Sequence, residues 1–311
     1  MNKQHVRDHV AKMVSAESTQ IAGFVVDLFC TPMMDVAAEF GLPSYVFFTS
    51  NAAVLGLMFH LETLSRDEKR DITELKDSDT ELEIPGFVNP VPAKVLPSML
   101  VDKQSGSAIF INIAKRFRES KGIIVNTFAE LESNAVRSLA EDGNVPPVYP
   151  VGPVIHLVNN ENEEEAMKIM RWLDDQPPLS VVFLCFGSMG ISSPLVSPFR
   201  TCRTGEEVRA QIEGDSTSPR AKWPPDLVLD YKKDFRSDNT KVMLVIAKEI
   251  ENGIRKLMEG WNECGEDIKQ RVKEMSEKSK VAVVDRWSSY NFVGLLIEDF
   301  MNNMHTYAFR E

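Results

Sequence analysis

The stretch Ser180-Val-Val-Phe-Leu-Cys-Phe-Gly-Ser-Met-Gly190 joins an apolar run to a glycine-containing turn. Residues 181–185 have the length and composition of a fully buried strand, and residues 186–190 those of a tight turn at its carboxyl end. In open α/β sheets, ligands bind at that edge, where glycine lets backbone N–H groups approach a phosphate. The stretch therefore predicts an α/β fold with a candidate phosphate-binding turn.

The first half of the chain alternates strand-like and helix-like segments, which is typical of a parallel sheet covered by helices. Residues 65–105 interrupt this alternation as a long, proline-punctuated loop with short helical pieces, and loops of that length are functional or disordered. The predicted strands are 21–28, 44–48 and 122–126, the first of them suited to a central strand, and the predicted helices are 33–40, 51–64 (entered through Ser50 or Asn51 as a cap), 107–121 and 130–140.

An acidic stretch, residues 159–165, marks a predicted domain boundary because the composition changes there. We expect a first domain over residues 1–150 and a second over 151–311. The second contains a helix at 165–174, a segment at 191–226 with no clear apolar period, and a last helix at 288–303.

Bulk properties exclude several classes of function. The net charge of -11 and the pI near 5.1 argue against nucleic-acid binding, and no apolar run is long enough to cross a bilayer. The N-terminus lacks the apolar core of a signal peptide, and the four cysteines lack paired or metal-type spacing, so we expect a reducing, cytoplasmic setting. His5 and His9 are spaced i,i+4 without a third ligand nearby, which favours a solvated helix face over a metal site.

Several ordered segments resemble the plant family-1 UDP-glycosyltransferases, in particular the branch that glucosylates phenolic small molecules. The resemblance implies a GT-B fold, with two facing Rossmann-like domains, an active site in the cleft and a last helix that crosses back to the first domain. The segments are Gly23–Cys30, Phe40–Ser50, Ile84–Phe87, Gly122–Glu132, Tyr149–Pro153, Arg171–Gly190, Leu229–Phe235 and Lys273–Ser279.

The implied reaction moves a sugar, expected to be glucose, from a UDP-sugar to a hydroxyl of a small phenolic acceptor with inversion at the anomeric carbon. A base removes the acceptor proton while groups around the diphosphate stabilise the leaving group. The UDP-sugar is a co-substrate, and the resemblance implies no further cofactor and no metal. It also leads us to expect a monomer.

The resemblance suggests roles for several residues. Asp27 matches the carboxylate that orients the catalytic His, although a strand-end Asp can also simply cap the next segment. Thr49 matches a sugar contact, with helix capping as an equal alternative. Gly187 and Ser188 would meet the donor diphosphate, and Phe47 and Phe87 could line an acceptor pocket, together with Met58 and Phe59, or be plain core.

Three departures from the family pattern predict little or no activity for this polypeptide. The chain begins after the family's first strand, which carries the catalytic His, and His5 and His9 do not correspond to it. The donor-binding signature box, with its uracil-stacking Trp and its His-Cys-Gly-Trp-Asn-Ser run, is absent. Residues 191–226 take the place of well over a hundred residues that the resemblance leads us to expect. With the first strand of one domain and the middle of the other missing, both domains are expected to be incomplete. The alternatives are a non-catalytic small-molecule-binding remnant and a non-functional product with exposed strand edges.

Overall fold

The computed structural model describes residues 3–16, 20–103, 106–155, 163–176, 181–182, 203–204 and 263–307. The chain divides into two compact units. The first comprises Met1–Ile155 and Lys273–Glu311, and the second comprises His156–Val272. The second unit therefore lies in sequence between two parts of the first.

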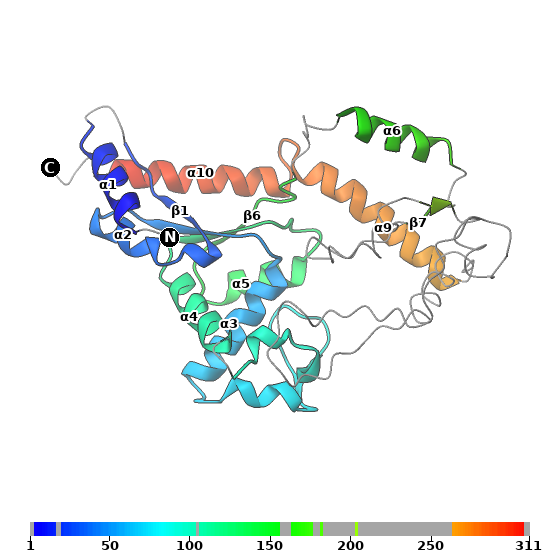
Figure 1. Cartoon of the computed structure of the whole chain (residues 1–311), viewed down its shortest axis with the longest axis horizontal. Helices are drawn as coiled ribbons and strands as arrows, with labels where there is room; N and C mark the ends of the chain where they lie inside the picture. Colours follow the sequence, from blue (N-terminus) through cyan, green and yellow to red (C-terminus); the bar gives the residue numbers. More distant parts are fainter. Residues whose placement is uncertain are drawn as a thin grey trace. The chain divides into compact units, whose positions relative to one another are not determined.

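The first unit is built on a four-stranded parallel sheet (Figure 1). The order along the sheet is β1-β2-β5-β6, so strands consecutive in the alternating pattern are neighbours in space. The strands are β1 (Phe24–Asp27), β2 (Ser44–Phe48), β5 (Gly122–Val125) and β6 (Val148–Pro150). The predicted parallel α/β arrangement is confirmed. The prediction of a central strand near residues 21–28 is wrong, because β1 is at the edge of the sheet among the described strands.

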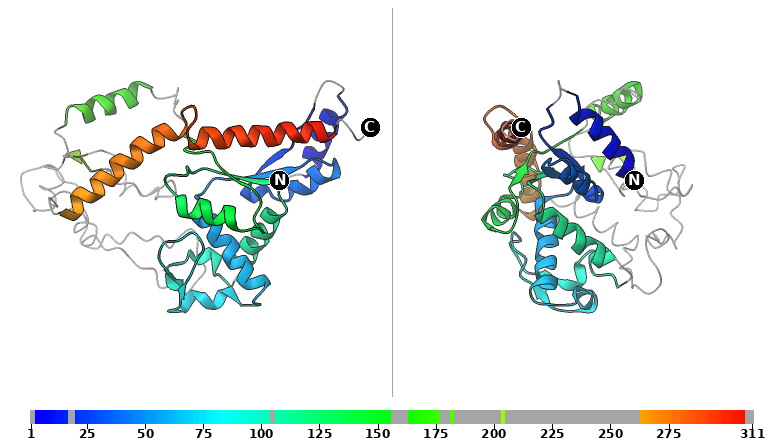
Figure 2. Two further views of the ribbon diagram at one scale, coloured as in Figure 1. Left: turned by 180° about the vertical axis from the view of Figure 1, so that it is seen from behind. Right: turned by 90° about the vertical axis from the view of Figure 1, so that its left-hand side faces the viewer.

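Helices from the first half of the chain pack on one face of this sheet, and Figure 2 shows the arrangement from two further sides. Side chains of β1, β2 and β5 that point to this face form the main hydrophobic core with the helices, and Val36, Val46 and Ile123 in it are fully buried. These apolar contacts explain why the alternating pattern folds into a layered structure. The helices are α1 (Lys3–Val14), α2 (Met33–Glu39), α3 (Ala52–Arg66), α4 (Gly106–Arg118) and α5 (Ser133–Glu141).

The proline-punctuated segment after α3 has a hydrophobic cluster of its own. Leu75 and Val101 in this segment are almost fully buried, and they pack with Leu57 and Leu61 of α3. Its pieces are short, as predicted: η2 (Ile72–Asp77), β3 (Glu81–Leu82), β4 (Val91–Pro92), η3 (Ala93–Val95) and η4 (Ser98–Leu100).

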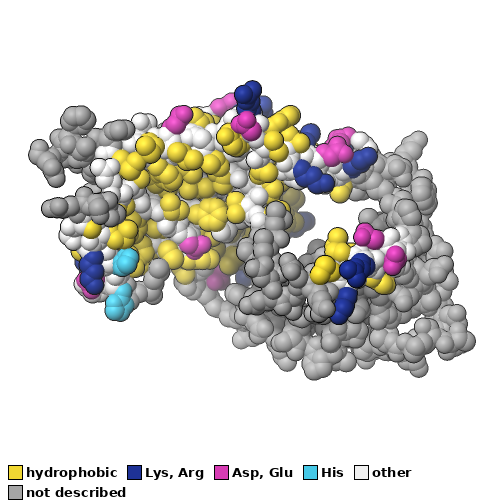
Figure 3. All heavy atoms as spheres, turned by 90° about the horizontal axis from the view of Figure 1, so that it is seen from above, with side chains coloured by type: hydrophobic (Ala, Val, Ile, Leu, Met, Phe, Trp, Pro, Cys, Tyr) yellow, Lys and Arg dark blue, Asp and Glu magenta, His cyan; other side chains and the backbone are white. Residues whose placement is uncertain are grey.

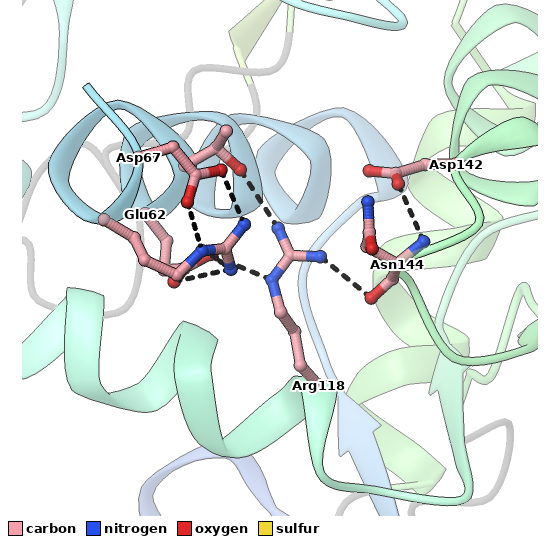
Figure 4. A network of polar contacts seen from close by, with 7 residues as sticks. Glu62, Asp67, Arg118, Asp142 and Asn144 are labelled. Carbon is pink, nitrogen blue, oxygen red and sulfur yellow. Dashed lines mark hydrogen bonds and ion pairs between the residues drawn. The ribbon is translucent and has the colours of Figure 1, made fainter.

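A buried ion network ties α3 to α4 (Figure 4). The Glu62 side chain has no exposed surface, and its carboxylate accepts hydrogen bonds from Arg66 and Arg118. Arg118 also donates to the Asn144 carbonyl oxygen at 2.9 Å, and its guanidinium lies 4.6 Å from the centre of the Phe59 ring. A buried carboxylate is tolerated here because two cations and short hydrogen bonds compensate it.

The opposite face of the sheet is contacted by the last helix, α10 (Ser288–Tyr307). Leu296 of α10 is buried against Tyr45, Ile124 and Tyr149, and Phe300 packs edge-to-face on the Tyr45 ring with centroids 4.7 Å apart. Helix α10 is preceded by α9 (Glu263–Ala282), whose sequence runs from the second unit into the first.

The described part of the second unit is small. It contains α6 (Glu163–Asp174) and a two-residue antiparallel pair between β7 (Val181–Val182) and β8 (Arg203–Thr204). The remainder of the irregular segment predicted at 191–226 lies outside the described residues. Among the helices that the structure describes, none is both long enough and apolar enough to cross a membrane.

Candidate functional site

The carboxyl ends of the parallel strands bring three predicted site residues to one edge of the sheet. The register pairs Asp27, the last residue of β1, with Phe47 of β2, and Thr49 follows directly after β2. Ligands of open α/β sheets bind at this edge. The structure therefore brings Asp27, Phe47 and Thr49 to the same edge of the sheet, and their functional roles remain predictions.

Asp27 is exposed, and its carboxylate caps the short 3-10 helix that follows it. Its Oδ1 accepts a hydrogen bond from the backbone N–H of Phe29 at 2.9 Å, at the start of η1 (Leu28–Cys30). This is the capping contact that the sequence offered as the alternative role of Asp27, and the side chain is exposed at the end of β1, the edge strand among the described strands. The contact with Phe29 engages Oδ1 of this exposed carboxylate.

Of the histidines whose side chains the structure describes, at positions 5, 9 and 60, none is placed as a partner of Asp27. His5 and His9 are exposed on α1, as the solvated-face interpretation predicted. His60 lies in the middle of α3, where burial lowers its pKa and favours the neutral imidazole. No group of three or more metal-ligating side chains occurs among the described residues.

Thr49 is exposed and does not cap α3. That position belongs to Asn51, whose Oδ1 accepts from the backbone N–H of Val54 at 2.9 Å, so the predicted Asn51 cap is confirmed and Thr49 remains a candidate for the sugar contact. The two oxygens of Glu132 accept from the backbone N–H groups of Ala52 and Ala53 at 2.9 and 3.0 Å. A carboxylate of the chain thus occupies the positive end of this helix.

Phe47 and Phe87 are not brought into one cluster. Phe47 packs beside Tyr45 on the α10 side of the sheet, whereas Phe87 packs on the cluster formed by the segment after α3. Met58 and Phe59 belong to the main core. Their burial favours the plain-core interpretation for Met58 and Phe59, while Phe47 and Phe87 are each only partly buried.

The end of β5 forms a tight polar corner that the sequence did not point to. Asn126 Oδ1 accepts from the backbone N–H of Val154 at 2.7 Å. A Cβ at Gly152 would come within 2.7 Å of that oxygen and of the Thr127 backbone nitrogen, so the corner needs glycine. Ser289 at the start of α10 donates to the Gly152 carbonyl oxygen at 2.5 Å. The corner therefore fixes the N-terminal end of α10 at the carboxyl edge of the sheet.

A second polar cluster fixes the other half of α10. The Asp299 carboxylate accepts from the Tyr45 hydroxyl at 2.6 Å and from the Tyr149 hydroxyl at 3.3 Å, and lies 3.0 Å from the Lys121 ammonium. Asn303 Nδ2 donates to the Ala22 carbonyl oxygen and to the Tyr45 hydroxyl, both at 2.9 Å. These contacts join residues up to 281 positions apart in the chain.

The cluster shifts the titration of its members. Burial raises the pKa of Asp299, but hydrogen bonds from Tyr45 and Lys121 outweigh that effect, so its pKa lies below the ordinary value. Burial and the Asp299 carboxylate raise the pKa of Tyr149 to about 12 and that of Tyr45 still further. Both phenols are therefore protonated donors at neutral pH, and the carboxylate is ionised.

The predicted donor-binding residues, Gly187 and Ser188, lie outside the described residues, as does the rest of the turn at 186–190. Their roles remain predictions. The part of the predicted site that the structure describes is therefore the edge that carries Asp27, Thr49 and Phe47.

No protein-family model matches the chain, but individual proteins match over nearly all of it. UDP-glycosyltransferase 71E1 of Stevia rebaudiana is 38% identical over 389 residues, covering 97% of this chain and 81% of the relative. Anthocyanidin 3-O-glucosyltransferase 6 of Manihot esculenta is 36% identical, covering 97% of each.

Two solved structures share the fold over 96% of this chain. A transferase from Siraitia grosvenorii in complex with UDP gives a TM-score of 0.73 at 30% identity and is covered to 86% of its length. UGT71G1 of Medicago truncatula, complexed with UDP-glucose, gives a TM-score of 0.68 at 31% identity and is covered to 79%.

The matched region of the Stevia rebaudiana relative extends over 389 residues, whereas the present chain has 311 in all. The relative therefore contains residues that have no counterpart within the matched part of this chain. Even so, these relatives are 36–41% identical to the chain over more than nine-tenths of its length. The parallel sheet and the similarity to solved GT-B structures agree with that relationship. The chain belongs to the plant UDP-glycosyltransferases, a family of hexosyl-transferring enzymes.

Proposed function

We propose that the reaction served by this chain's site is transfer of glucose from UDP-glucose to a hydroxyl of a small phenolic plant metabolite, with inversion. Relatives named as flavonoid and anthocyanidin glucosyltransferases support this acceptor class. The observation that carries the proposal is the carboxylate of Asp27, which stands exposed at the carboxyl edge of the sheet next to Phe47 and Thr49.

In this proposal Asp27 is a positioning residue. One of its oxygens is engaged by the Phe29 N–H group, and the other is available to accept the N–H of an imidazole, which would orient that ring and stabilise its protonated form. The imidazole removes the acceptor proton, the acceptor oxygen attacks the anomeric carbon, and UDP departs with the bonding electrons.

For the isolated polypeptide we propose negligible turnover. Asp27 makes no ion pair with any described residue, and the histidines at positions 5, 9 and 60 are accounted for on α1 and α3. A positioning carboxylate without its base does not activate a hydroxyl. The setting we propose is the cytoplasm, in keeping with the cysteine spacing.

The alternative function is binding of a phenolic ligand without catalysis. It is favoured by the acceptor-side segment after α3, which retains its own hydrophobic cluster and packs on α3. Phe87 lies on this cluster and remains partly exposed, so it could contact a planar aromatic ligand.

The test is a sugar-transfer assay with the purified chain, UDP-glucose and a panel of flavonols, read by mass spectrometry. A parallel calorimetric titration measures binding of the same flavonols and of UDP. We expect no product above a heat-denatured control, and saturable binding of a flavonol would favour the alternative. Product that forms with the natural chain and is lost in Asp27→Asn would refute the proposed inactivity and confirm the role of Asp27.

A further inference from the structure

The three-residue connection that carries Thr49 is held at both of its ends by one other segment. It joins β2, which ends at Phe48, to α3, which begins at Ala52. At the first end, β2 pairs with β5, and the Phe48 carbonyl oxygen accepts a hydrogen bond from the backbone N–H of Asn126 at 3.3 Å. At the second end, α3 is held by Glu132, which belongs to the same segment after β5. The position of Thr49 therefore depends on that segment.

The three N–H groups that open the first turn of α3 are all engaged by side chains. The two Glu132 oxygens accept from Ala52 and Ala53, and Asn51 Oδ1 accepts from Val54. N–H groups at the start of a helix are those that bind anionic ligands in nucleotide-binding α/β proteins. Here the carboxylate of Glu132 takes the place of such an anion and neutralises the positive end of the helix.

The carboxyl edge of the sheet is acidic. The segments that directly follow the four strands contain no Lys, Arg or His, and the structure describes all of them: residues 28–32, 49–51, 126–132 and 151–155. The carboxylates at this edge belong to Asp27, Glu130 and Glu132. Basic side chains do occur elsewhere, since Lys and Arg stand near Asp and Glu on the face seen in Figure 3. A phosphate would therefore meet carboxylates and no cation from these four segments.

We propose that Glu132 is a positioning residue that holds Thr49 at the edge of the sheet and makes this edge specific for uncharged ligands that carry hydroxyl groups. This inference rests on the glucose transfer proposed above and adds a division of the donor to it. The glucose ring is neutral and rich in hydroxyl groups, so it suits the edge. The diphosphate of UDP-glucose is repelled and has to be held away from these four segments.

The hydrogen-bonding capacity of the edge agrees with this specificity. The exposed Thr49 hydroxyl can both donate and accept, so it can pair with a sugar hydroxyl in either sense. A deprotonated phosphate oxygen only accepts, and it needs a cation or free N–H groups. Glu132 has already taken the N–H groups nearest to Thr49.

The same segment offers a matched control. Glu130 lies two residues before Glu132, and its Oε2 accepts from the Ser288 hydroxyl at the start of α10 at 2.7 Å. Both carboxylates thus bind the first residues of a helix, but the helices differ. Loss of Glu130 should affect α10 and leave the connection that carries Thr49 unchanged.

The test is hydrogen exchange of the full chain, read by mass spectrometry on the peptide that covers residues 49–55, with formate and inorganic phosphate as probe anions. In Glu132→Ala we expect this peptide to exchange about tenfold faster than in the natural chain, because two N–H groups lose a charged acceptor. Either anion should slow that exchange again by binding the freed N–H groups, whereas chloride at equal ionic strength should not. The natural chain should respond to none of the three anions.

Several results would overturn the proposal. Exchange that is equally fast in the natural chain and in Glu132→Ala would exclude the positioning role. A purely stabilising role would give faster exchange in Glu132→Ala without rescue by formate or phosphate, and protection of the natural chain by phosphate would exclude the specificity. Acceleration of the same peptide in Glu130→Ala would show a general loss of stability and also contradict the assignment.

A second variant keeps the test decisive if Glu132→Ala does not fold. Glu132→Gln retains one acceptor oxygen and loses the charge, so its exchange at residues 49–55 should lie between those of a bound and a free helix start. Exchange equal to that of the natural chain would contradict the proposal. The measurements involve neither sugar nor acceptor, so failure of the role of Glu132 is distinguishable from failure of the proposed glucose transfer.

Discussion

The two faces of the sheet are held by different means. One face packs on five helices from the first half of the chain and has a large buried core, in which Val36, Val46 and Ile123 are fully buried. The other face has a small cluster, and within the described residues it is contacted by α10. Both faces of a parallel sheet need cover, yet here one cover is extensive and the other is narrow.

The polar contacts differ in the same way. On the extensive side, the Glu62 network joins one helix to another and the sheet itself is held by apolar packing. On the narrow side, the Asp299 cluster joins the helix directly to the sheet. Where little apolar surface is buried, polar contacts carry a larger share of the attachment, so disrupting them should loosen α10 selectively.

The largest loss of stability is expected from a substitution on the side of the sheet that α1 to α5 cover. Arg118→Ala removes a partner of the fully buried Glu62 carboxylate together with the contact to Phe59. The buried Glu62 carboxylate would then keep only Arg66 as a charged partner. We expect this to lower the free energy of unfolding by about 3 kcal/mol, measured by urea denaturation. The matched change Arg66→Ala, at a more exposed partner of Glu62, should cost clearly less. Equal costs for the two variants would contradict the importance of the buried partner.

The next effect is on the α10 side. Asp299→Asn removes the ion pair with Lys121 and weakens the hydrogen bond from Tyr45, which should cost about 1.5 kcal/mol. Hydrogen exchange should speed up along α10 and stay unchanged in α3, because the two helices cover different faces. Uniform acceleration in both helices would show that the two faces are not independently attached.

The same variant carries a pH signature. The pKa of Asp299 is lowered in the folded protein, so its contribution is present above the ordinary carboxyl range and is lost as the pH falls through the depressed value. The difference in unfolding free energy between the natural chain and Asp299→Asn should therefore shrink as the pH falls below about 4. A constant difference between pH 7 and pH 3 would exclude this linkage.

A smaller effect separates the two phenols. Tyr45 donates to Asp299 at 2.6 Å, whereas Tyr149 donates at 3.3 Å. Tyr45→Phe should cost about 1 kcal/mol and Tyr149→Phe less than half of that, since both variants keep the ring and lose only the hydroxyl. Thermal denaturation of the two variants in parallel measures the difference, and the reverse order would refute the ranking by distance.

The smallest expected effect is at an exposed pair away from both faces. Lys94 and Asp79 are 3.5 Å apart with side chains 64% and 95% exposed. Water screens such a pair, so Lys94→Ala should leave the urea midpoint unchanged within error. A measurable fall of the urea midpoint in this variant would mean that the protein is destabilised by any substitution of a charged residue. The other variants would then say nothing specific about the two faces of the sheet.

Local signals in the sequence were sufficient for much of the fold. The apolar run Ser44–Phe48 and the cap at Asn51 were both predictable, because strand composition and capping act over a few residues. The approximate limits of α2 and α10 followed from helical periodicity and from breakers such as Gly41 and Pro43. Asp27 was correctly placed at the end of a strand.

Contacts between distant residues could not be predicted in that way. Nothing near Glu132 indicates that it binds the start of α3, 80 positions earlier, and nothing near Asp299 identifies Tyr45 as its partner. The edge position of β1 depends on which strands flank it, which its own residues do not encode. The exposure of Asp27 depends on neighbouring strands in the same way, because burial is a property of the surroundings.

The attachment of α10 to the sheet has a consequence for how the protein is made. Tyr45 and Asp299 meet across 254 residues, so the contact cannot form until helix α10 has left the ribosome. Closing so long a loop is slow, because its entropy must be lost before the contact forms. During synthesis the emerging sheet therefore exposes Tyr45 and Ile124 until α10 packs on them. In that interval the native contacts with α10 do not yet shield this face of the sheet from water or from other chains.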